Sequence, residues 1–524
     1  MAERAAVERT AVEHAAAGRP DGGSAVVHDV AVVGAGPAGL AAAVTAAEAG
    51  SRVLLLDAAG QTGGQYWRHR DEAAHADDPR GHHDWKVFTD LRARLRAAVA
   101  AGRIDHRPWT SVWLLERTGE GFRLRTTPTV GRGATATGTA TGTATGTATG
   151  TANSVAASAP ATHLARRLVL CPGAYDRQLP VPGWDLPGVL AAGGAQALLK
   201  GHGVLAGHRV VVAGTGPFLL PVATGLADAG ARVVALCEAA SPVRWARHLP
   251  AAARQGTKLL QAGEYAARLA RHRVRLRTRT VVTEILGEDR VTAVRLGRVD
   301  RRGRVVGEGP VVPADAVALG WGFTPQLELP LMLETATALG ADGSLVVRVD
   351  PDQRSSVPGV YVAGEATGVG GAGLAVAEGL VAGAAAAGGR PDARHRRQVL
   401  AHRAFARAMH DVYPVPANWT GWVTPGTLVC RCEEVTAGDL RRACHDLAAE
   451  DPREARSTTR AGMGRCQGRV CGYATAGVLA GLTGRGVTEE DLLATGRRPL
   501  AAPVTLGTLA ALDGAADDEE VPTA

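Results

Sequence analysis

The chain has 524 residues, enough for three or four domains of about 100–200 residues each with separate hydrophobic cores. Hydrophobic residues make up 46% of the chain and charged residues 21%, which is typical of folded proteins, and the formal net charge is +7. The positive charge comes almost entirely from arginines spread along the chain without a long basic run, so we expect no nucleic-acid partner.

The ends and the apolar stretches of the chain bear on its location. Residues 1–27 carry mixed charges and no continuous apolar run, which predicts a disordered leader unlike a secretory signal. Two apolar stretches, Ala31–Ala49 and Gly370–Gly388, are interrupted by glycines, and the second contains Glu378, so no transmembrane segment is expected. The seven cysteines, four of which form a late cluster, suit a reducing compartment where thiols bind metals. We therefore predict a cytoplasmic protein.

Two strand–helix–strand units follow one another in the sequence. The first begins at Asp29 with an apolar strand, a glycine turn and a helix, and its second strand ends at Asp57. The second begins near Arg209 and repeats the same order up to Glu238. Such repeats are typical of doubly wound α/β domains that bind dinucleotides. The predicted first domain covers residues 28–200 and returns at 321–390, with the second domain at 201–320.

The segment between the two units is predicted to contain a hairpin and a loop. Val112–Glu116 and Phe122–Thr126 have the pattern of paired strands, and Arg167–Leu170 that of a strand returning to the sheet. Between them lies a low-complexity stretch of Thr, Ala and Gly, at about 128–163. Because these residues supply no hydrophobic face, we expect a mobile loop there.

The glycine turn of the first unit has the spacing of a dinucleotide fingerprint. Gly34 permits the tight turn, Gly36 lets a pyrophosphate approach the backbone, and Gly39 lets helix and strand pack closely. The N-terminus of the helix then faces the phosphates. Asp57 ends the following strand, where a carboxylate can accept hydrogen bonds from ribose hydroxyls.

Further motifs favour FAD over NAD in this first site. Gly64 and Gln65 follow the second strand, Gly173 follows the returning strand, and Gly364 and Glu365 come late in the chain. These pieces, in this order, resemble the two-dinucleotide-domain flavoprotein reductases. That resemblance implies that Glu365 takes the place of the usual aspartate whose carboxylate binds the ribityl chain of FAD.

The second unit keeps only part of the fingerprint. Gly214 and Gly216 are present, but Leu219 stands at the third glycine position, so looser packing of helix on strand is expected. Glu238 ends the second strand and predicts NAD or another unphosphorylated adenine nucleotide, because a carboxylate repels a 2′-phosphate. The alternative is a vestigial domain, or one that holds a nucleotide without hydride exchange.

Four late cysteines form a Cys-x-Cys pair, Cys430 and Cys432, and a Cys-x4-Cys pair, Cys466 and Cys471. Four thiolates can close around zinc or around two irons, and the one-residue spacing of the first pair favours iron. Cys444 stands midway and is expected to be a core residue. The segment resembles the bacterioferritin-associated-ferredoxin-like [2Fe-2S] domain, which implies that the four cysteines are its ligands. This domain is predicted at 428–485, between a linker at 391–427 and a tail at 486–524.

The whole order of domains resembles the A-type subunits of opine oxidases, the B subunit of hydrogen cyanide synthase and the alpha subunits of some proline dehydrogenases. The local matches are residues 63–66, 216–221 and 459–469. The resemblance implies an α/β protein with two Rossmann-like domains, for FAD and an NAD-type nucleotide, and a small C-terminal [2Fe-2S] domain.

The same resemblance implies a function in electron transfer. An amino-acid-oxidase-like flavoprotein subunit would oxidise an amino acid, opine or other secondary amine, and this chain would carry the electrons to an acceptor. No acid–base pair for amine oxidation can be assigned in the sequence, which agrees with chemistry on another subunit. The competing hypothesis is a self-sufficient NADH-dependent reductase of a protein acceptor. Cys171 and Cys237 are isolated in sequence, so a disulfide reductase is not expected.

Overall fold

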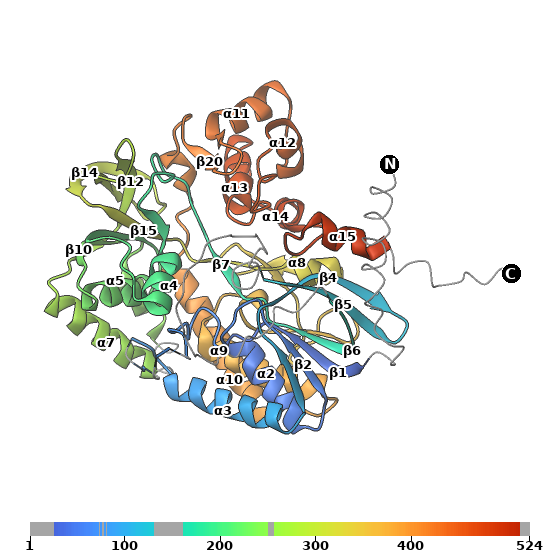
Figure 1. Ribbon diagram of the computed structural model, residues 1–524. Coiled ribbons are helices and arrows are strands. Elements are labelled where there is room, and N and C mark those ends of the chain that lie inside the picture. Colours follow the sequence, from blue (N-terminus) through green and yellow to red (C-terminus); the bar gives the residue numbers. More distant parts are fainter. Residues whose placement is uncertain are drawn as a thin grey trace, which may run out of the picture.

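The computed structural model describes residues 26–129 except 73, 76, 77 and 80, and residues 161–249 and 256–513. The predicted leader at 1–27 lies outside the described residues except for its last two positions. The predicted mobile loop at about 128–163 also lies outside them except at its two ends. In Figure 1 the first domain is at the bottom, the second at the left, and the C-terminal module lies above both.

A seven-stranded sheet forms the first domain. Its strands run in the order β3-β2-β1-β6-β5-β4, and β19 pairs with the second half of β6. The strands are β1 (Val27–Val33), β2 (Val53–Leu56), β3 (Ile104–Arg107), β4 (Thr110–Thr118), β5 (Gly121–Pro128), β6 (Ala161–Leu170) and β19 (Val360–Val362). The predicted hairpin is confirmed, since β4 and β5 pair antiparallel, and β6 is the predicted returning strand.

Each face of this sheet is covered, because successive strand residues point to opposite sides. Val30 and Val32 pack with α2 (Pro37–Glu48), α3 (Trp85–Ala100) and α9 (Ala372–Ala386). Ala31 and Val33 pack on the other side with α8 (Glu328–Met332) and the hairpin of β17 (Thr337–Leu339) and β18 (Leu345–Val347). The glycine fingerprint follows β1 and therefore lies at the carboxyl edge of the sheet.

The second domain has a parallel five-stranded sheet in the order β11-β10-β9-β15-β8. Its elements are β8 (Val189–Ala191), α4 (Ala192–His202), β9 (Arg209–Gly214), α5 (Leu219–Asp228), β10 (Arg232–Glu238), η1 (Pro242–Arg247), α7 (Gly256–Arg271), β11 (Leu276–Thr278) and β15 (Ala316–Gly320). An antiparallel sheet adds β12 (Thr280–Leu286), β13 (Ala293–Val299) and β14 (Val305–Pro313). Because β8 pairs with β15, this sheet begins before residue 201, where the sequence placed the boundary. The three-residue β8 carries no pattern that would have revealed this.

Two short strands, β7 (Ala174–Asp176) and β16 (Phe323–Pro325), pair antiparallel where the chain passes between the domains.

After α9, α10 (Ala393–Val412) and η3 (Trp419–Trp422) occupy most of the predicted linker. The C-terminal module contains β20 (Leu428–Cys430), β21 (Val435–Thr436), α11 (Ala437–Asp446), α12 (Pro452–Thr459) and α13 (Gly472–Leu482). The predicted tail also holds two helices, α14 (Glu489–Gly496) and α15 (Leu506–Asp513), and α14 packs against α12 and α13. No helix of the described chain is both long and apolar enough to cross a membrane.

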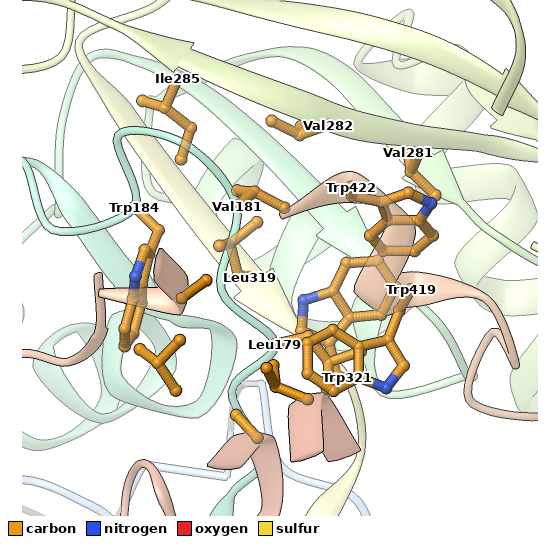
Figure 2. Packing of buried hydrophobic residues seen from close by; sticks show 14 of the residues in the cluster. Leu179, Val181, Trp184, Val281, Val282, Ile285, Leu319, Trp321, Trp419 and Trp422 are labelled. Atoms are coloured by element: carbon orange, nitrogen blue, oxygen red, sulfur yellow. The ribbon is translucent and has the colours of Figure 1, made fainter. Parts of the chain in front are cut away.

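Four tryptophans join the C-terminal module to the second domain. Trp321 follows β15, Trp419 and Trp422 come from η3, and Trp184 precedes β8, and all four are buried in one core (Figure 2). The ring centroids of Trp321 and Trp422 lie 5.4 Å apart. Trp184 Nε1 donates to the carbonyl of Leu428 at 2.6 Å. The second domain and the cysteine-rich module therefore share a single hydrophobic core.

Removal of one of these rings tests how far the module depends on the shared core. Trp422 is 6% exposed and its Nε1 donates to the Gly303 carbonyl at 2.9 Å. We expect Trp422→Ala to lower the free energy of unfolding by about 3–5 kcal/mol, because a buried cavity and an unpaired carbonyl remain. Scanning calorimetry measures the effect. The control is Leu447→Ala, at a leucine in the same module that is 61% exposed, with an expected change within about 0.5 kcal/mol. Equal free energies of unfolding in the two variants would contradict the expectation.

Candidate flavin and iron–sulfur sites

The three fingerprint glycines have different steric surroundings. A Cβ at Gly34, whose φ is +99°, would lie 2.3 Å from the carbonyl oxygen of Cys171. A Cβ at Gly39 would lie 1.7 Å from the carbonyl oxygen of Gly34, so α2 can pack on β1 only with glycine there. A Cβ at Gly36 would come no closer than 3.8 Å to its nearest neighbour, the Cα of Gly64. Gly36 therefore faces open space, as the approach of a pyrophosphate requires.

The loop that contains Gly64 closes over the fingerprint. The N–H of Gly63 donates to the carbonyl of Ala35 at 2.8 Å. A Cβ at Gly64, whose φ is +60°, would lie 2.9 Å from the Cα of Gly36. Gln65, the next predicted residue, is exposed and accepts a hydrogen bond from Arg68 at 3.0 Å. Two facing glycines beside the N-terminus of α2 thus form a cradle that fits the phosphates of FAD.

Asp57 lies at the carboxyl end of β2, beside the same turn. One carboxylate oxygen accepts from the N–H of Ala35 and the other from the N–H of Ala59 at 2.6 Å. Burial raises the pKa of Asp57, and these two N–H groups oppose the rise. The carboxylate therefore orders the fingerprint backbone and lies where a ribose would bind.

The late glycine motif returns to the first site. Gly364 and Gly173 have φ angles of +81°, and a Cβ at Gly364 would lie 3.1 Å from the Cβ of Ala38 in α2. Glu365 accepts from the N–H groups of Gly370 at 3.3 Å and Gly371 at 3.0 Å, next to the N-terminus of α9. Burial raises the pKa of Glu365 to about 7. The structure thus brings the two segments of the predicted flavin domain together.

An ion pair with a fully buried carboxylate, which the sequence analysis did not assign, supports this motif. Glu378 accepts from the N–H of Gly364 at 2.9 Å and from the Thr367 hydroxyl at 2.7 Å. Arg403 in α10 donates to its other oxygen at 3.0 and 2.7 Å. Burial raises the pKa of Glu378, and Arg403 opposes the rise. The sequence offered one signal for this role, because Glu378 is a single acid inside the otherwise apolar helix α9.

In the second domain the carboxylate at the end of β10 accepts hydrogen bonds from its own glycine turn, as Asp57 does in the first domain. Glu238 is 4% exposed and accepts from the N–H of Gly216 at 2.9 Å, from the N–H of Ala240 at 2.8 Å and from the Thr215 hydroxyl at 3.0 Å. Burial raises its pKa to about 7. A Cβ at Gly214 would lie 1.7 Å from the carbonyl oxygen of Gly320. The three predicted residues therefore meet at one turn.

The third fingerprint position explains how this turn differs from the first. Leu219 is 2% exposed. Its Cδ2 atom packs against Gly320, where an added Cβ would lie 2.9 Å from it. The helix α5 begins at Leu219, whereas α2 begins at Pro37, directly after Gly36. The N-terminus of α5 is thus further along the chain from its glycine turn than that of α2 is. The looser packing expected from the sequence stays a prediction.

The four late cysteines lie together in the C-terminal module, with Cys430 and Cys471 buried, Cys466 half-buried and Cys432 exposed. The thiol of Cys471 contacts the sulfurs of Cys430 and Cys466, and Cys466 in turn contacts Cys432. Within the described chain, no cluster of His, Cys, Asp and Glu side chains has the geometry of a single-ion site. Cys444 lies apart, half-buried on α11 against the module core, as expected.

Backbone N–H groups surround these sulfurs. The N–H of Gly462, whose φ is +82°, donates to Sγ of Cys430 at 3.4 Å. The contact with Cys471 and neighbouring N–H groups lower the pKa of Cys430 to about 6 and that of Cys466 to about 5. The pKa of Cys471 is raised by the same contacts, and that of Cys432 is raised as well. Thiolates are the forms that bind iron. A Cβ at Gly464 would lie 2.3 Å from the Cβ of Cys432, so the loop folds tightly around the ligands. The donor set therefore fits a [2Fe-2S] cluster.

Arg469, within the second cysteine pair, links this module to the first domain. Its Nε lies 2.6 Å from Glu328 Oε1 on α8 and 3.1 Å from the Tyr175 hydroxyl on β7. A second nitrogen donates to the carbonyl of Cys466 at 3.2 Å. Arg469 is 14% and Glu328 8% exposed, so water screens this pair little. The ligand loop is thus held directly on the flavin domain.

The surroundings of the glycines give a sharp test of the flavin site. We expect Gly36→Ala to fold but to lose bound FAD, because its methyl group enters the space that the pyrophosphate needs. The measurement is the ratio of released flavin to protein, with iron content as the measure of folding. The control is Gly263→Ala in α7, where no atom lies within 4 Å of the added Cβ. Full flavin content in Gly36→Ala would contradict the site.

The cysteines allow a matched comparison as well. We expect Cys466→Ser to lose the visible absorption and the iron of the cluster while keeping FAD, because one soft ligand is replaced by a hydroxyl. Cys444→Ser, in the same module, is expected to keep both. Equal iron content in the two variants would show that Cys466 is not a ligand.

Comparisons with known proteins agree with this geometry. Residues 28–388 match the pyridine nucleotide-disulphide oxidoreductase family, and residues 428–480 match the BFD-like [2Fe-2S] binding domain. The buried Cys171 and Cys237 lie apart, and burial raises the pKa of the Cys237 thiol to about 12, so neither forms the redox pair of a disulfide reductase.

Relatives extend the match over nearly the whole chain. The A-type subunit of opine oxidase from Rhizobium meliloti is 33% identical over 510 residues, covering 92% of this chain and 98% of that protein. Hydrogen cyanide synthase subunit HcnB of Pseudomonas aeruginosa is 29% identical over 454 residues, covering 84% and 90%. The crystal structure of L-proline dehydrogenase from P. horikoshii shares the fold, with a TM-score of 0.61, 20% identity and coverage of 93% and 80%. The chain is therefore an FAD-dependent oxidoreductase that belongs to the pyridine nucleotide-disulphide oxidoreductase family and carries a BFD-like [2Fe-2S] binding domain.

Proposed function

We propose that this chain is the electron-transfer subunit of a heteromeric dehydrogenase or oxidase of amino acids, opines or other secondary amines. It receives electrons from a partner subunit, which is an amino-acid-oxidase-like flavoprotein, and delivers them to an acceptor. FAD can accept two electrons and release them singly, whereas a [2Fe-2S] cluster carries one, so the pair couples two-electron to one-electron chemistry.

The observation that carries the proposal is the direct contact between the cysteine loop and the flavin domain. Arg469 belongs to the loop of Cys466 and Cys471, and its partners Glu328 and Tyr175 belong to the flavin domain. The shared tryptophan core holds the same module on the second domain. The two proposed cofactor sites thus belong to parts of the chain in direct contact, which supports electron transfer between them.

The names of the relatives supply the substrate class. Opine oxidase and hydrogen cyanide synthase are each represented by one of their subunits, and each of these subunits aligns with most of this chain. The name of the first enzyme describes the oxidation of an opine, which is an amine-containing compound. We therefore assign the amine chemistry to a partner subunit.

We also propose that Gly214, Gly216 and Glu238 hold NAD or another unphosphorylated adenine nucleotide. Both oxygens of Glu238 already accept hydrogen bonds from the fingerprint turn. A nucleotide here would share this carboxylate with the backbone. Hydride exchange with FAD is not part of the proposed function, which separates it from a self-sufficient NADH-dependent reductase.

Anaerobic reduction distinguishes the two functions. The purified holo-chain is mixed with NADH alone, and separately with a panel of opines, proline, glycine and sarcosine in the presence of the partner subunit. Bleaching of the flavin and cluster absorption is followed over time. We expect no prompt bleaching with NADH and prompt bleaching with the partner and one amine.

The controls omit the partner or the amine in turn. Prompt reduction by NADH alone would replace the proposal by the self-sufficient reductase. Absence of reduction with the partner and every amine in the panel would contradict the proposed substrate class.

A further inference from the structure

Three arginines gather around the second cysteine pair. A guanidinium nitrogen of Arg498 donates to the carbonyl of Gln467, between Cys466 and Cys471. A Cβ at Gly468, whose φ is +82°, would lie 2.6 Å from the same nitrogen, so glycine makes room for the guanidinium. Arg469 lies in the loop itself, and Arg456 on α12 is close enough to Arg498 to repel it.

These side chains meet at the seam between the flavin domain and the cysteine-rich module. Arg469 and Arg498 line a cavity of about 70 Å³ there, with Tyr175 and Tyr473 among its walls. Among the described residues of this lining, Glu328 is the one acidic side chain. One of its oxygens pairs with Arg469, and the other is buried without a hydrogen-bond partner.

The local charge is therefore positive before any cluster is bound. Burial, Arg456 and Arg469 lower the pKa of Arg498, while Glu328 and Cys471 oppose the fall. Arginine keeps its proton in proteins, so this repulsion persists as a positive potential at the ligand loop. A cluster of two ferric ions, two sulfides and four thiolates carries net negative charge and would offset it.

We infer that Arg498 and Glu328 set the reduction potential of the cluster in opposite directions, Arg498 raising it and Glu328 lowering it. The inference rests on the proposed [2Fe-2S] site. Reduction adds one electron and makes the cluster more negative, so a nearby cation stabilises the reduced form and a nearby carboxylate destabilises it. Arg498 acts as a positioning and electrostatic residue, since it ligates no iron.

The test is the midpoint potential of the cluster in the full-length holo-chain, by EPR-monitored titration with dithionite as the one-electron reductant. We expect Arg498→Gln to lower the equilibrium constant for reduction about tenfold, a shift of about 59 mV, and Glu328→Gln to raise the potential. Arg498→Lys keeps the charge and should restore the wild-type value to within about twofold. The matched control is Arg497→Gln, at the exposed neighbour, with no shift.

Iron content and the visible spectrum of each variant report whether the cluster is assembled. Opposite shifts in Arg498→Gln and Glu328→Gln support the inference, because a merely structural disturbance has no reason to change sign with the charge removed. Shifts in the same direction, no shift in either, or an equal effect of Arg497→Gln would overturn it. If Arg498→Gln assembles no cluster, Glu328→Gln tests the inference alone: a raised potential supports it, and a lowered or unchanged potential overturns it. A wild-type chain without a cluster signal would instead overturn the proposed cluster itself.

Discussion

Burial of four tryptophans in one core is the constraint on which the arrangement of this protein depends. Trp184 and Trp321 come from the second domain, and Trp419 and Trp422 from the segment before the cysteines. Such large rings contribute much of the apolar area that a small module of short helices can bury. The cysteine module therefore cannot leave the second domain without exposing the centre of that domain's core.

The two dinucleotide domains order their glycine turns with different residues. In each, the carboxylate that ends the second strand, Asp57 or Glu238, is a buried acceptor for the N–H groups of its own glycine turn. In the first domain Gly39 lets the helix begin at the turn, but in the second Leu219 fills that space. Because the helix N-terminus supplies the positive end of the dipole, the first site is better arranged for phosphates.

Three buried carboxylates are each paired with an arginine. Arg403 compensates Glu378 behind the flavin motif, Arg177 compensates Asp342 beside Tyr473, and Arg469 compensates Glu328 at the ligand loop. Buried pairs are retained only with close hydrogen-bonded partners, since an isolated charge is costly. They fix how these segments contact one another, while the tryptophan core buries apolar area between the C-terminal module and the second domain.

Local patterns in the sequence determined both strand–glycine–helix units, the β4–β5 hairpin and the identity of the four clustered cysteines, because each is encoded over a few adjacent residues. The tertiary structure alone decided that β8 belongs to the second sheet, that the predicted linker buries Trp419 and Trp422, and that Arg469 pairs with Glu328. These features join residues far apart in the chain, and no local periodicity records such contacts. The fingerprints could therefore be read in advance, but the contacts that hold the C-terminal module on the two other domains could not.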